Sequence, residues 1–384
     1  MKLVPFGSIC KLQNGRAFKP SDWSEKGDPI VRIQNLNNES KPFNYCNFSV
    51  EERFHINTGD LLFSWSGTPG TSFGAFFWNR GFGVLNQHIF RVDVDENKIS
   101  KDYLRYAINS QLNYIIDQAH GGVGLKHITK GKLEAVEIPL PPLDEQKRIA
   151  AILDKADAIR CKRQQAIQLA DDFLRSVFLD MFGDPVTNPK GWEIKKISDV
   201  VTKVTDGVHF KPEYLESGIP FISVKDITTG ELKFDNTKFI SKEAHEKYIR
   251  RCNPEYLDIL YTKIGATYGR PTIIDVKKDF SLYVSVALLK PDHSKINPYF
   301  LKEVLATSAL KRQADRSIKG AGVPDLHLIE IKKFILPVPC MEIQNDFVNK
   351  TSNIRMKIKK IKLSIKRLDE LFNSLSQKAF AGEL

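Results

Sequence analysis

Residues 137–182 decide the fold, and their sequence is EIPLPPLDEQKRIAAILDKADAIRCKRQQAIQLADDFLRSVFLDMF. Prolines end a short apolar strand at the start of this stretch. The helix that follows has an acidic first turn, as the helix dipole favours. A second copy of the signature, FILPVPCMEIQ, occupies residues 334–344. The two copies predict two long helices, over residues 143–182 and 341–384.

The duplication extends beyond these helices to the whole chain. GDLLF (59–63) returns as LDILY (257–261), and PLP (139–141) returns as PVP (337–339), at a constant offset of 198 residues. Gln146 returns as Gln344 at the same offset. Because solenoid repeats are only tens of residues long, this offset indicates a duplicated domain. A duplicated chain can fold with internal pseudo-two-fold symmetry, and duplex DNA also has a two-fold axis.

Both predicted helices carry apolar residues at alternating spacings of three and four. This 3.5-residue period is typical of a coiled-coil seam rather than of a surface helix on a compact core. The predicted fold class is α+β, with two mixed α/β domains (1–142 and 183–340) separated by two long antiparallel helices, which return the C-terminus to the N-terminus. Packing of each helix on its own domain alone is the alternative. The predicted seam or partner-facing residues are Ile149, Ile152, Ile159, Phe173, Val177, Ile354, Ile358, Ile361, Ile365, Leu368 and Phe372.

Composition narrows the class of protein. The 384 residues include 57 Lys and Arg against 46 Asp and Glu, a formal net charge of +11, which favours a polyanionic partner. The five cysteines are scattered without CxxC spacing, and the first ten residues do not resemble a secretory signal, so we expect a reduced cytoplasmic protein. No apolar run is long enough for a membrane span, so we expect no membrane partner.

Motifs of common catalytic sites are missing from the sequence. It has no GxxxxGK(S/T) phosphate loop, no GxGxxG fingerprint, no zinc spacing of His and Cys, and no GxSxG elbow. Asp325, Glu330 and Lys332 imitate the PD…ExK pattern of Mg-dependent nucleases, whose carboxylates hold a metal. The duplication disfavours this alternative, because His127 and Lys132 stand where the first half would need the two acids. We therefore expect no catalytic residue and no metal site in this chain.

Five segments, in this order along the chain, carry a resemblance to a known family. They are EIPLPPLDEQKRIAAILDKAD (137–157), FGDPVTNPKGWEIKKISDV (182–200), TDGVHFKPEYLESGIPFISVKDI (205–227), PEYLDILYTKIGATYG (254–269) and QKAFAGEL (377–384). On these segments the chain resembles the specificity subunit of type I restriction–modification enzymes over essentially its whole length. The second proline signature departs from the first at two positions, where Cys340 replaces Pro142 and Ile343 replaces Glu145.

The resemblance implies a non-catalytic subunit that binds double-stranded DNA. Residues 1–142 and 183–340 would be target-recognition domains, each for one half of a split, asymmetric sequence. Helices 143–182 and 341–384 would act as spacers and dock two methyltransferase subunits, which use S-adenosylmethionine to methylate adenine. A restriction and translocase subunit would join them with ATP and Mg, so we expect no cofactor in this chain. A coiled-coil scaffold whose domains do not touch DNA is the remaining alternative.

Residues able to contact DNA gather in polar and aromatic clusters between the apolar runs. Arg and Lys suit guanine, Asn and Gln suit adenine, and cations or small donors suit phosphate. Ordinary structural roles are the alternative for each of them, such as a core position for Trp65 or a hydrogen-bonded turn at residues 86–88. The candidates are Arg16, Lys19, Arg32, Gln34, Asn35, Trp65, Thr68, Asn86, Gln87, His88, Lys126, His127, Asp206, His209, Lys225, Lys263, Thr267, Arg270, Lys319 and His327.

Overall fold

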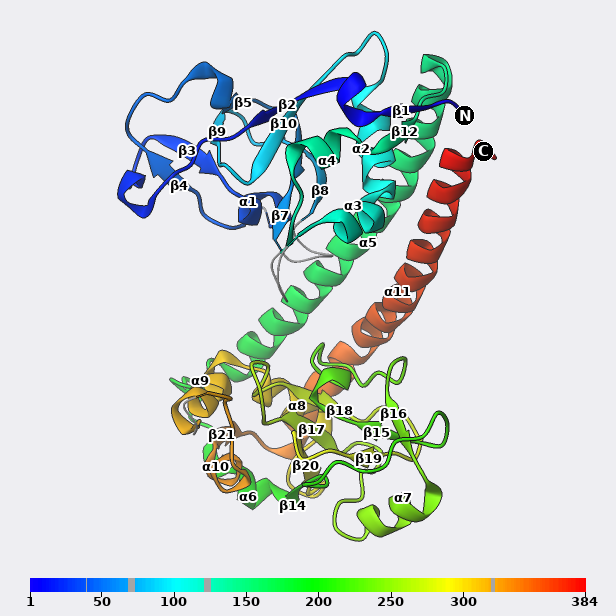
Figure 1. The fold of residues 1–384 in the computed structure, drawn as a ribbon. Helices are drawn as coiled ribbons and strands as arrows, with labels where there is room; N and C mark the ends of the chain where they lie inside the picture. Colours follow the sequence, from blue (N-terminus) through cyan, green and yellow to red (C-terminus); the bar gives the residue numbers. More distant parts are fainter. Residues whose placement is uncertain (39, 68–72, 121–125, 319–321) are drawn as a thin grey trace. The chain divides into compact units, whose positions relative to one another are not determined.

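The computed structural model divides into two compact units. It describes residues 1–384 except 39, 68–72, 121–125 and 319–321. Unit 1 consists of Met1–Gln165 and Lys362–Leu384, and unit 2 of Ala166–Ile361 (Figure 1). Each unit therefore contains one globular part and one half of each long helix. The boundaries between the units, at residues 165/166 and 361/362, fall inside the two long helices. Each half of a long helix packs on the globular part of its own unit.

Unit 1 is built from short strands in two main sheets. The strand bounds are β1 (Leu3–Pro5), β2 (Cys10–Asn14), β3 (Asp28–Val31), β4 (Asn44–Cys46), β5 (His55–Ile56), β6 (Leu61–Ser64), β7 (Ser66–Gly67), β8 (Gly74–Phe77), β9 (Gly83–Leu85), β10 (Ile89–Val94), β11 (Lys126–His127) and β12 (Glu137–Pro139). One sheet has the antiparallel order β2-β10-β6-β8. The other has the order β4-β3-β9-β5, in which β3 and β9 are parallel. β1 pairs with β12, and β7 with β11.

Unit 2 repeats this topology. Its strands are β13 (Glu193–Lys196), β14 (Val201–Asp206), β15 (Ile219–Ile222), β16 (Lys238–Ile240), β17 (Ile259–Thr262), β18 (Pro271–Ile273), β19 (Ser281–Leu282), β20 (Val286–Pro291) and β21 (Ile335–Val338). The main sheet has the order β14-β20-β17-β18, a second sheet has the order β16-β15-β19 with β15 and β19 parallel, and β13 pairs with β21. The same strand order in both main sheets confirms the predicted duplication.

The repeated segments GDLLF and LDILY form the central strands β6 and β17. Both strands are buried along their whole length, which explains their continuous apolar sequence. Leu61 of β6 packs in the larger core, while Leu62 faces a smaller core on the other side of the sheet. Ile259 and Leu260 of β17 divide in the same way. The repeat thus encodes a strand with core on both faces.

Helices flank the sheets of each unit, and α2, α3 and α4 of unit 1 correspond to α8, α9 and α10 of unit 2. Unit 1 has α1 (Ile33–Asn37), α2 (Lys101–Ser110), α3 (Leu112–Gln118) and α4 (Lys130–Glu134), and unit 2 has α6 (Ile197–Val200), α7 (Lys242–Ile249), α8 (Pro298–Leu305), α9 (Ser308–Ser317) and α10 (Leu328–Lys333). Asn109 ties α2 to strand β8, since its Oδ1 accepts from the Ala75 amide at 2.8 Å and its Nδ2 donates to the Ala75 carbonyl at 3.0 Å.

The long helices are α5 (Leu143–Phe182) and α11 (Met341–Ala381). In unit 1 their segments run antiparallel, because Arg160 pairs with Asp369 at 2.8 Å and Arg148 donates to the carbonyl of Leu384 at 2.6 Å. A Cβ built at Gly382 would lie 3.3 Å from the side chain of Met1, so the C-terminus lies near the N-terminus, as predicted (Figure 1).

In unit 2, the end of α5 packs on the start of α11 through aromatic rings. The ring centroid of Phe182 lies 5.3 Å from that of Phe347 and 4.8 Å from that of Phe300. Thr351, three residues before the first predicted seam residue of α11, is fully buried, and its hydroxyl donates to the Phe347 carbonyl at 2.8 Å.

Burial along α11 follows the predicted seam, but burial along α5 does not. Every seam residue predicted on α11 is buried or half-buried. On α5, Ile149 is buried and Ile152 and Val177 are half-buried, whereas Ile159 and Phe173 are 47% and 53% exposed, so these two do not lie in a buried seam and stay candidates for a partner-facing surface. Buried apolar residues outside the predicted seam are Ala150, Leu153, Ile167, Leu174, Phe178 and Phe182. Leu153, Ile167 and Leu174 each follow directly after a position of the predicted seam, so part of the buried face is shifted by one residue. Where two apolar residues are adjacent on α5, packing buries one of them more deeply than the other.

One glutamine in each unit fixes the start of its long helix. The Gln146 side chain accepts from the Ser100 amide at 2.8 Å and donates to the carbonyls of Lys98 and Pro141. Gln344 makes the matching bonds in unit 2, accepting from Asn297 at 2.8 Å and donating to Lys295 and Pro339. Both glutamines are fully buried. The duplication therefore extends to individual hydrogen bonds.

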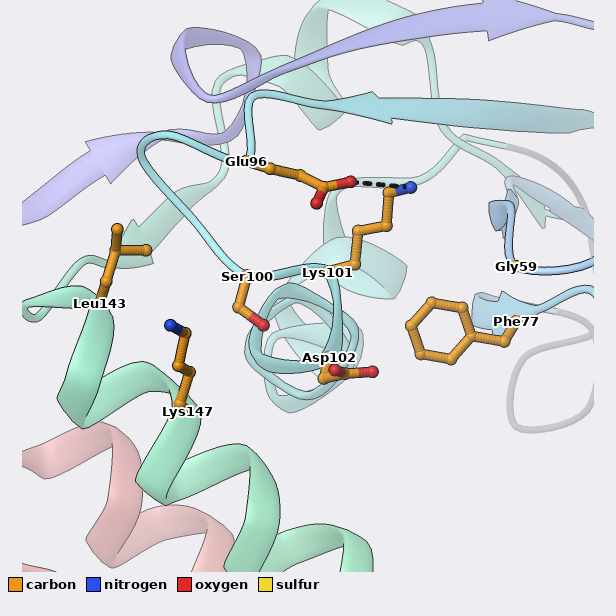
Figure 2. A pocket seen from close by; sticks show the side chains of 8 residues that line it. All are labelled: Gly59, Phe77, Glu96, Ser100, Lys101, Asp102, Leu143 and Lys147. Atoms are coloured by element: carbon orange, nitrogen blue, oxygen red, sulfur yellow. Dashed lines mark ion pairs between the residues drawn. The ribbon is translucent and has the colours of Figure 1, made fainter.

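A surface hollow of about 610 Å³ lies in unit 1 between the starts of α2 and α5 (Figure 2). Its lining carries both signs of charge, and Lys101 pairs with Glu96 at 3.0 Å. The other lining residues are Gly59, Phe77, Ser100, Asp102, Leu143 and Lys147. None of the predicted DNA-contacting residues lines it, so the candidate site lies elsewhere. Among the helices that the structure describes, none is both long and apolar enough to cross a membrane.

Candidate nucleic-acid interface

The turn that precedes strand β10 in unit 1 and strand β20 in unit 2 is held by matching backbone hydrogen bonds. In unit 1 the turn is Asn86-Gln87-His88, between β9 and β10. The Asn86 amide donates to Val31 at 3.1 Å, and the Trp65 amide donates to His88 at 3.2 Å.

In unit 2 the corresponding turn is Tyr283-Val284-Ser285, between β19 and β20. The Tyr283 amide donates to Ile222 at 2.8 Å, and the Lys263 amide donates to Ser285 at 3.0 Å. Lys263 therefore occupies the position of Trp65, as the 198-residue offset predicts. The backbone is shared between the two turns, while the side chains differ.

A glycine brings a strand end against each turn. A Cβ at Gly15, after β2, would lie 2.2 Å from the Asn86 carbonyl oxygen, and one at Gly207, after β14, would lie 1.9 Å from that of Leu282. No real Cβ contact is that short, so both positions require glycine. The next residues, Arg16 and Val208, then bridge to the turns of their own units.

The unit 1 turn carries a cluster of ring and amide groups. The ring of Trp65 lies 5.3 Å from that of His88, and Gln87 Nε2 lies 3.2 Å from His88 Nε2. Trp65 Nε1, Gln87 Oε1 and His88 Nδ1 are buried and have no hydrogen-bond partner in the part of the chain that the structure describes. Because buried polar atoms are normally paired, these unpaired donors and acceptors indicate a place for a polar ligand.

Strand β11 adds two further candidates to this cluster. His127 pairs with Ser66 and Lys126 with Gly67. Both candidates therefore lie opposite the two residues that follow Trp65 in the sequence. The structure thus brings together seven predicted residues of unit 1, which are Arg16, Trp65, Asn86, Gln87, His88, Lys126 and His127.

The remaining candidates of unit 1 lie apart or serve the fold. Asn35 is only 1% exposed, and its amide accepts from Arg32 N and donates to the carbonyls of Lys41 and Pro42, so its prediction as a DNA contact is wrong. Arg32 bonds Asn44 at 3.0 Å. Lys19 and Gln34 are exposed at the starts of short helices. Thr68 lies outside the described residues.

The unit 2 site is a charged network centred on Asp206. Asp206 is nearly fully buried, and its Oδ1 lies 2.5 Å from Arg251 Nη2 and 3.0 Å from His209 Nε2. Lys263 Nζ lies 3.4 Å from Asp206 and 3.6 Å from Asp325. His327 joins through Asp325 at 3.8 Å.

Of the six residues in this network, four are predicted DNA-contacting residues, which are Asp206, His209, Lys263 and His327. Asp325 entered the sequence analysis through the nuclease-like pattern, and Arg251 was missed. Arg251 follows helix α7 and meets Asp206 only through the fold, so no local sequence signal marks it.

The other candidates of unit 2 bond the backbone nearby. Lys225 donates to Asn236 at 2.9 Å, and Arg270 to Thr228 at 2.5 Å. The carbonyl of Thr267 accepts from the Thr262 hydroxyl at 2.7 Å. Lys319 lies outside the described residues.

The acids of the nuclease-like pattern are engaged separately. Asp325 pairs with Lys263, and Glu330 pairs with Lys333 at 3.1 Å. Across the described residues, no group of three or more His, Cys, Asp or Glu side chains could hold a metal ion. The structure therefore gives the nuclease alternative no support.

His88 should make unit 1 sensitive to acid. Burial, and then the nearby charge of Arg32, lower the pKa of His88 from its ordinary 6.5. The folded chain therefore binds this proton less readily than the unfolded chain, so stability falls as the pH drops through the unfolded-state pKa of 6.5. We expect His88→Gln to flatten the loss of stability between pH 7.5 and 5.5, measured by denaturant unfolding. An unchanged pH slope would contradict a lowered pKa of His88 in the folded chain.

Comparisons with known proteins agree with this architecture. The family model of the type I restriction modification DNA specificity domain matches residues 1–170 and 189–371. The chain is 25% identical to the type I restriction enzyme EcoBI specificity subunit of Escherichia coli over 99% of this chain and 85% of that protein. It is 24% identical to the MjaVIII specificity subunit of Methanocaldococcus jannaschii, over 78% of this chain and 73% of that protein.

A solved structure has the same fold. The S subunit of a type I restriction–modification system from M. genitalium superposes with a TM-score of 0.60 at 16% identity, covering 99% of this chain and 96% of that one. Because the family model covers most of the sequence, in both halves of the duplication, the chain belongs to the family of type I restriction–modification DNA specificity subunits, which recognise DNA and are not themselves catalytic.

Proposed function

We propose that this chain recognises a split, asymmetric DNA target, with one half-site bound by each unit. The observation that carries the proposal is the pair of turns at residues 86–88 and 283–285, whose backbone bonds match while their side chains differ. Because the backbone of the two turns is the same, each turn presents its side chains to DNA in the same way, and the different side chains select different bases. Ring and amide groups in unit 1 and a charged network in unit 2 support two unlike half-sites.

The two long helices dock two methyltransferase subunits. Solvent-exposed apolar side chains on both helices support this, because such residues mark surfaces that bind another protein. They are Ile159, Leu169 and Phe173 on α5 and Met356, Leu363 and Leu371 on α11. The duplication offers each methyltransferase a similar surface, which supports two copies for each specificity chain.

Catalysis belongs to the partner subunits. The methyltransferases use S-adenosylmethionine and flip the target adenine, since a base inside a duplex cannot be reached. A restriction and translocase subunit adds ATP and Mg, and this chain holds no cofactor. The assembly acts in the cytoplasm, where the chromosomal DNA lies. The net charge of +11 supports attraction to that DNA.

Mapping methylated adenines tests this function. The chain is produced with its methyltransferase partners in a host that lacks them, and modified bases are located by sequencing. We expect one bipartite, asymmetric motif. Changing Gln87 and His88 to alanine should alter one half-site and leave the other intact. Methylation without a consensus, a symmetric motif, or a change in both half-sites would contradict the proposal.

A further inference from the structure

A buried carboxylate in unit 2 holds an exposed arginine. The side chain of Asp206 is 3% exposed, whereas that of Arg251 is 57% exposed. The Arg251 backbone is fixed as well, since its amide donates to Tyr248 at 3.2 Å and its carbonyl accepts from Lys203 Nζ at 2.7 Å. An arginine fixed at one end of its fork loses little further freedom when it binds a ligand.

Part of the Arg251 fork is left for that ligand. A guanidinium has five N–H donors in a planar arrangement. Nη2 contacts Asp206 and His209, and no partner for Nε or Nη1 is found among the described residues. Parallel N–H pairs of a guanidinium always include Nη2, together with Nε or Nη1. Asp206 takes one hydrogen of Nη2, and His209 Nε2 donates to the same carboxylate at 3.0 Å, so it does not accept from Nη2. The second hydrogen of Nη2 and the parallel N–H beside it can therefore bind one ligand.

The buried carboxylate behind Arg251 favours a neutral acceptor over a phosphate. Asp206 contacts both Arg251 and Lys263, and Asp325 contacts Lys263, while the ammonium of Lys203 lies on the far side, at the Arg251 carbonyl. The carboxylate directly behind Arg251 repels an anion. It also polarises the guanidinium and so strengthens the hydrogen bonds that Arg251 gives to a neutral base.

Guanine is the base whose edge fits this fork. In the major groove it presents two adjacent acceptors, N7 and O6, whereas adenine presents one acceptor and one donor. Resting on the proposed function, we propose that Arg251 recognises a guanine in the half-site bound by unit 2. Asp206 is its positioning residue, since it holds Arg251 without touching the base.

Binding of the reconstituted complex to duplexes that contain the mapped target tests the assignment. Arg251→Lys keeps the charge and removes the fork, and it should lower affinity about tenfold to a hundredfold. The variant should lose discrimination at one G·C pair of one half-site and nowhere else. Replacing that guanine by 7-deazaguanine, which lacks the N7 acceptor, should weaken the wild-type complex and barely affect the variant. Arg250→Lys, at the neighbouring exposed arginine, is the matched control and should leave binding unchanged.

Asp206→Asn should weaken discrimination at the same base pair only, a change that a purely structural role would not confine to one position. Because Asp206 is buried, this variant could fail to fold, and Arg251→Lys then decides alone. An equal loss on all sequences, with a salt dependence reduced by about one phosphate contact, would overturn the inference in favour of phosphate binding. So would unchanged discrimination, or a half-site without guanine. A wild-type complex without any sequence preference would overturn the proposed function as well.

Discussion

Gln344→Leu is expected to lower the free energy of unfolding of unit 2 by about 3–5 kcal/mol. Gln344 is fully buried, and its amide bonds the Asn297 amide and the carbonyls of Lys295 and Pro339. Leucine has a similar size but no polar atom, so three backbone groups lose their partner in a place that water does not reach. Each such group costs roughly 1–3 kcal/mol, part of which the apolar leucine offsets.

Denaturant unfolding of the full chain measures the loss, and hydrogen exchange assigns it to a unit. Gln146→Leu should have the same effect in unit 1, and the double variant should show additive losses because the two sites share no partner. Gln377→Leu, at an exposed position of α11, is the control and should change stability by less than about 0.5 kcal/mol. Equal stability of the Gln344 and Gln377 variants would contradict the role of this residue.

The duplication and the long helices were predictable because their signals are local or repeated. Prolines mark where strands end, acidic residues mark the first helical turn, and a sustained 3.5-residue period indicates a long helix. Gln146 and Gln344 recur at one offset because the same three bonds hold the same turn in each unit.

The register of α5 was not predictable from its sequence. Ile152 and Leu153, and likewise Phe173 and Leu174, are adjacent apolar residues, and either member could face inward. Only the surface on which the helix packs makes the choice, and that surface is distant in the sequence.

The candidate site was predictable where a polar cluster interrupts apolar strands, as at residues 86–88. It was not predictable where a side chain has two possible uses. Asn35 has the chemistry to bind adenine, but its buried amide holds the start of α1 and a neighbouring loop. Arg251 shows the reverse, because its contact with Asp206 joins segments that no periodicity relates.

Phe182→Ala should lower the free energy of unfolding of unit 2 by about 3–5 kcal/mol, the usual cost of emptying a buried aromatic site. Phe182 is 1% exposed, and its ring lies within 5.3 Å of those of Phe178, Phe300 and Phe347, measured between centroids. These rings join both long helices to α8, so the cavity would lie where three helices meet. Denaturant unfolding of the full chain measures the change.

Phe173→Ala on the same helix is the matched control, and it also tests the register of α5. Because Phe173 is half-exposed, we expect a loss of less than about 0.5 kcal/mol. Its effect should appear instead as weaker binding of the methyltransferase subunits, since the exposed ring belongs to the proposed docking surface. If Phe173→Ala destabilises the isolated chain as much as Phe182→Ala, then Phe173 faces inward and the seam follows the register expected from the sequence. If it changes neither stability nor binding, the apolar surface of α5 has another role than docking.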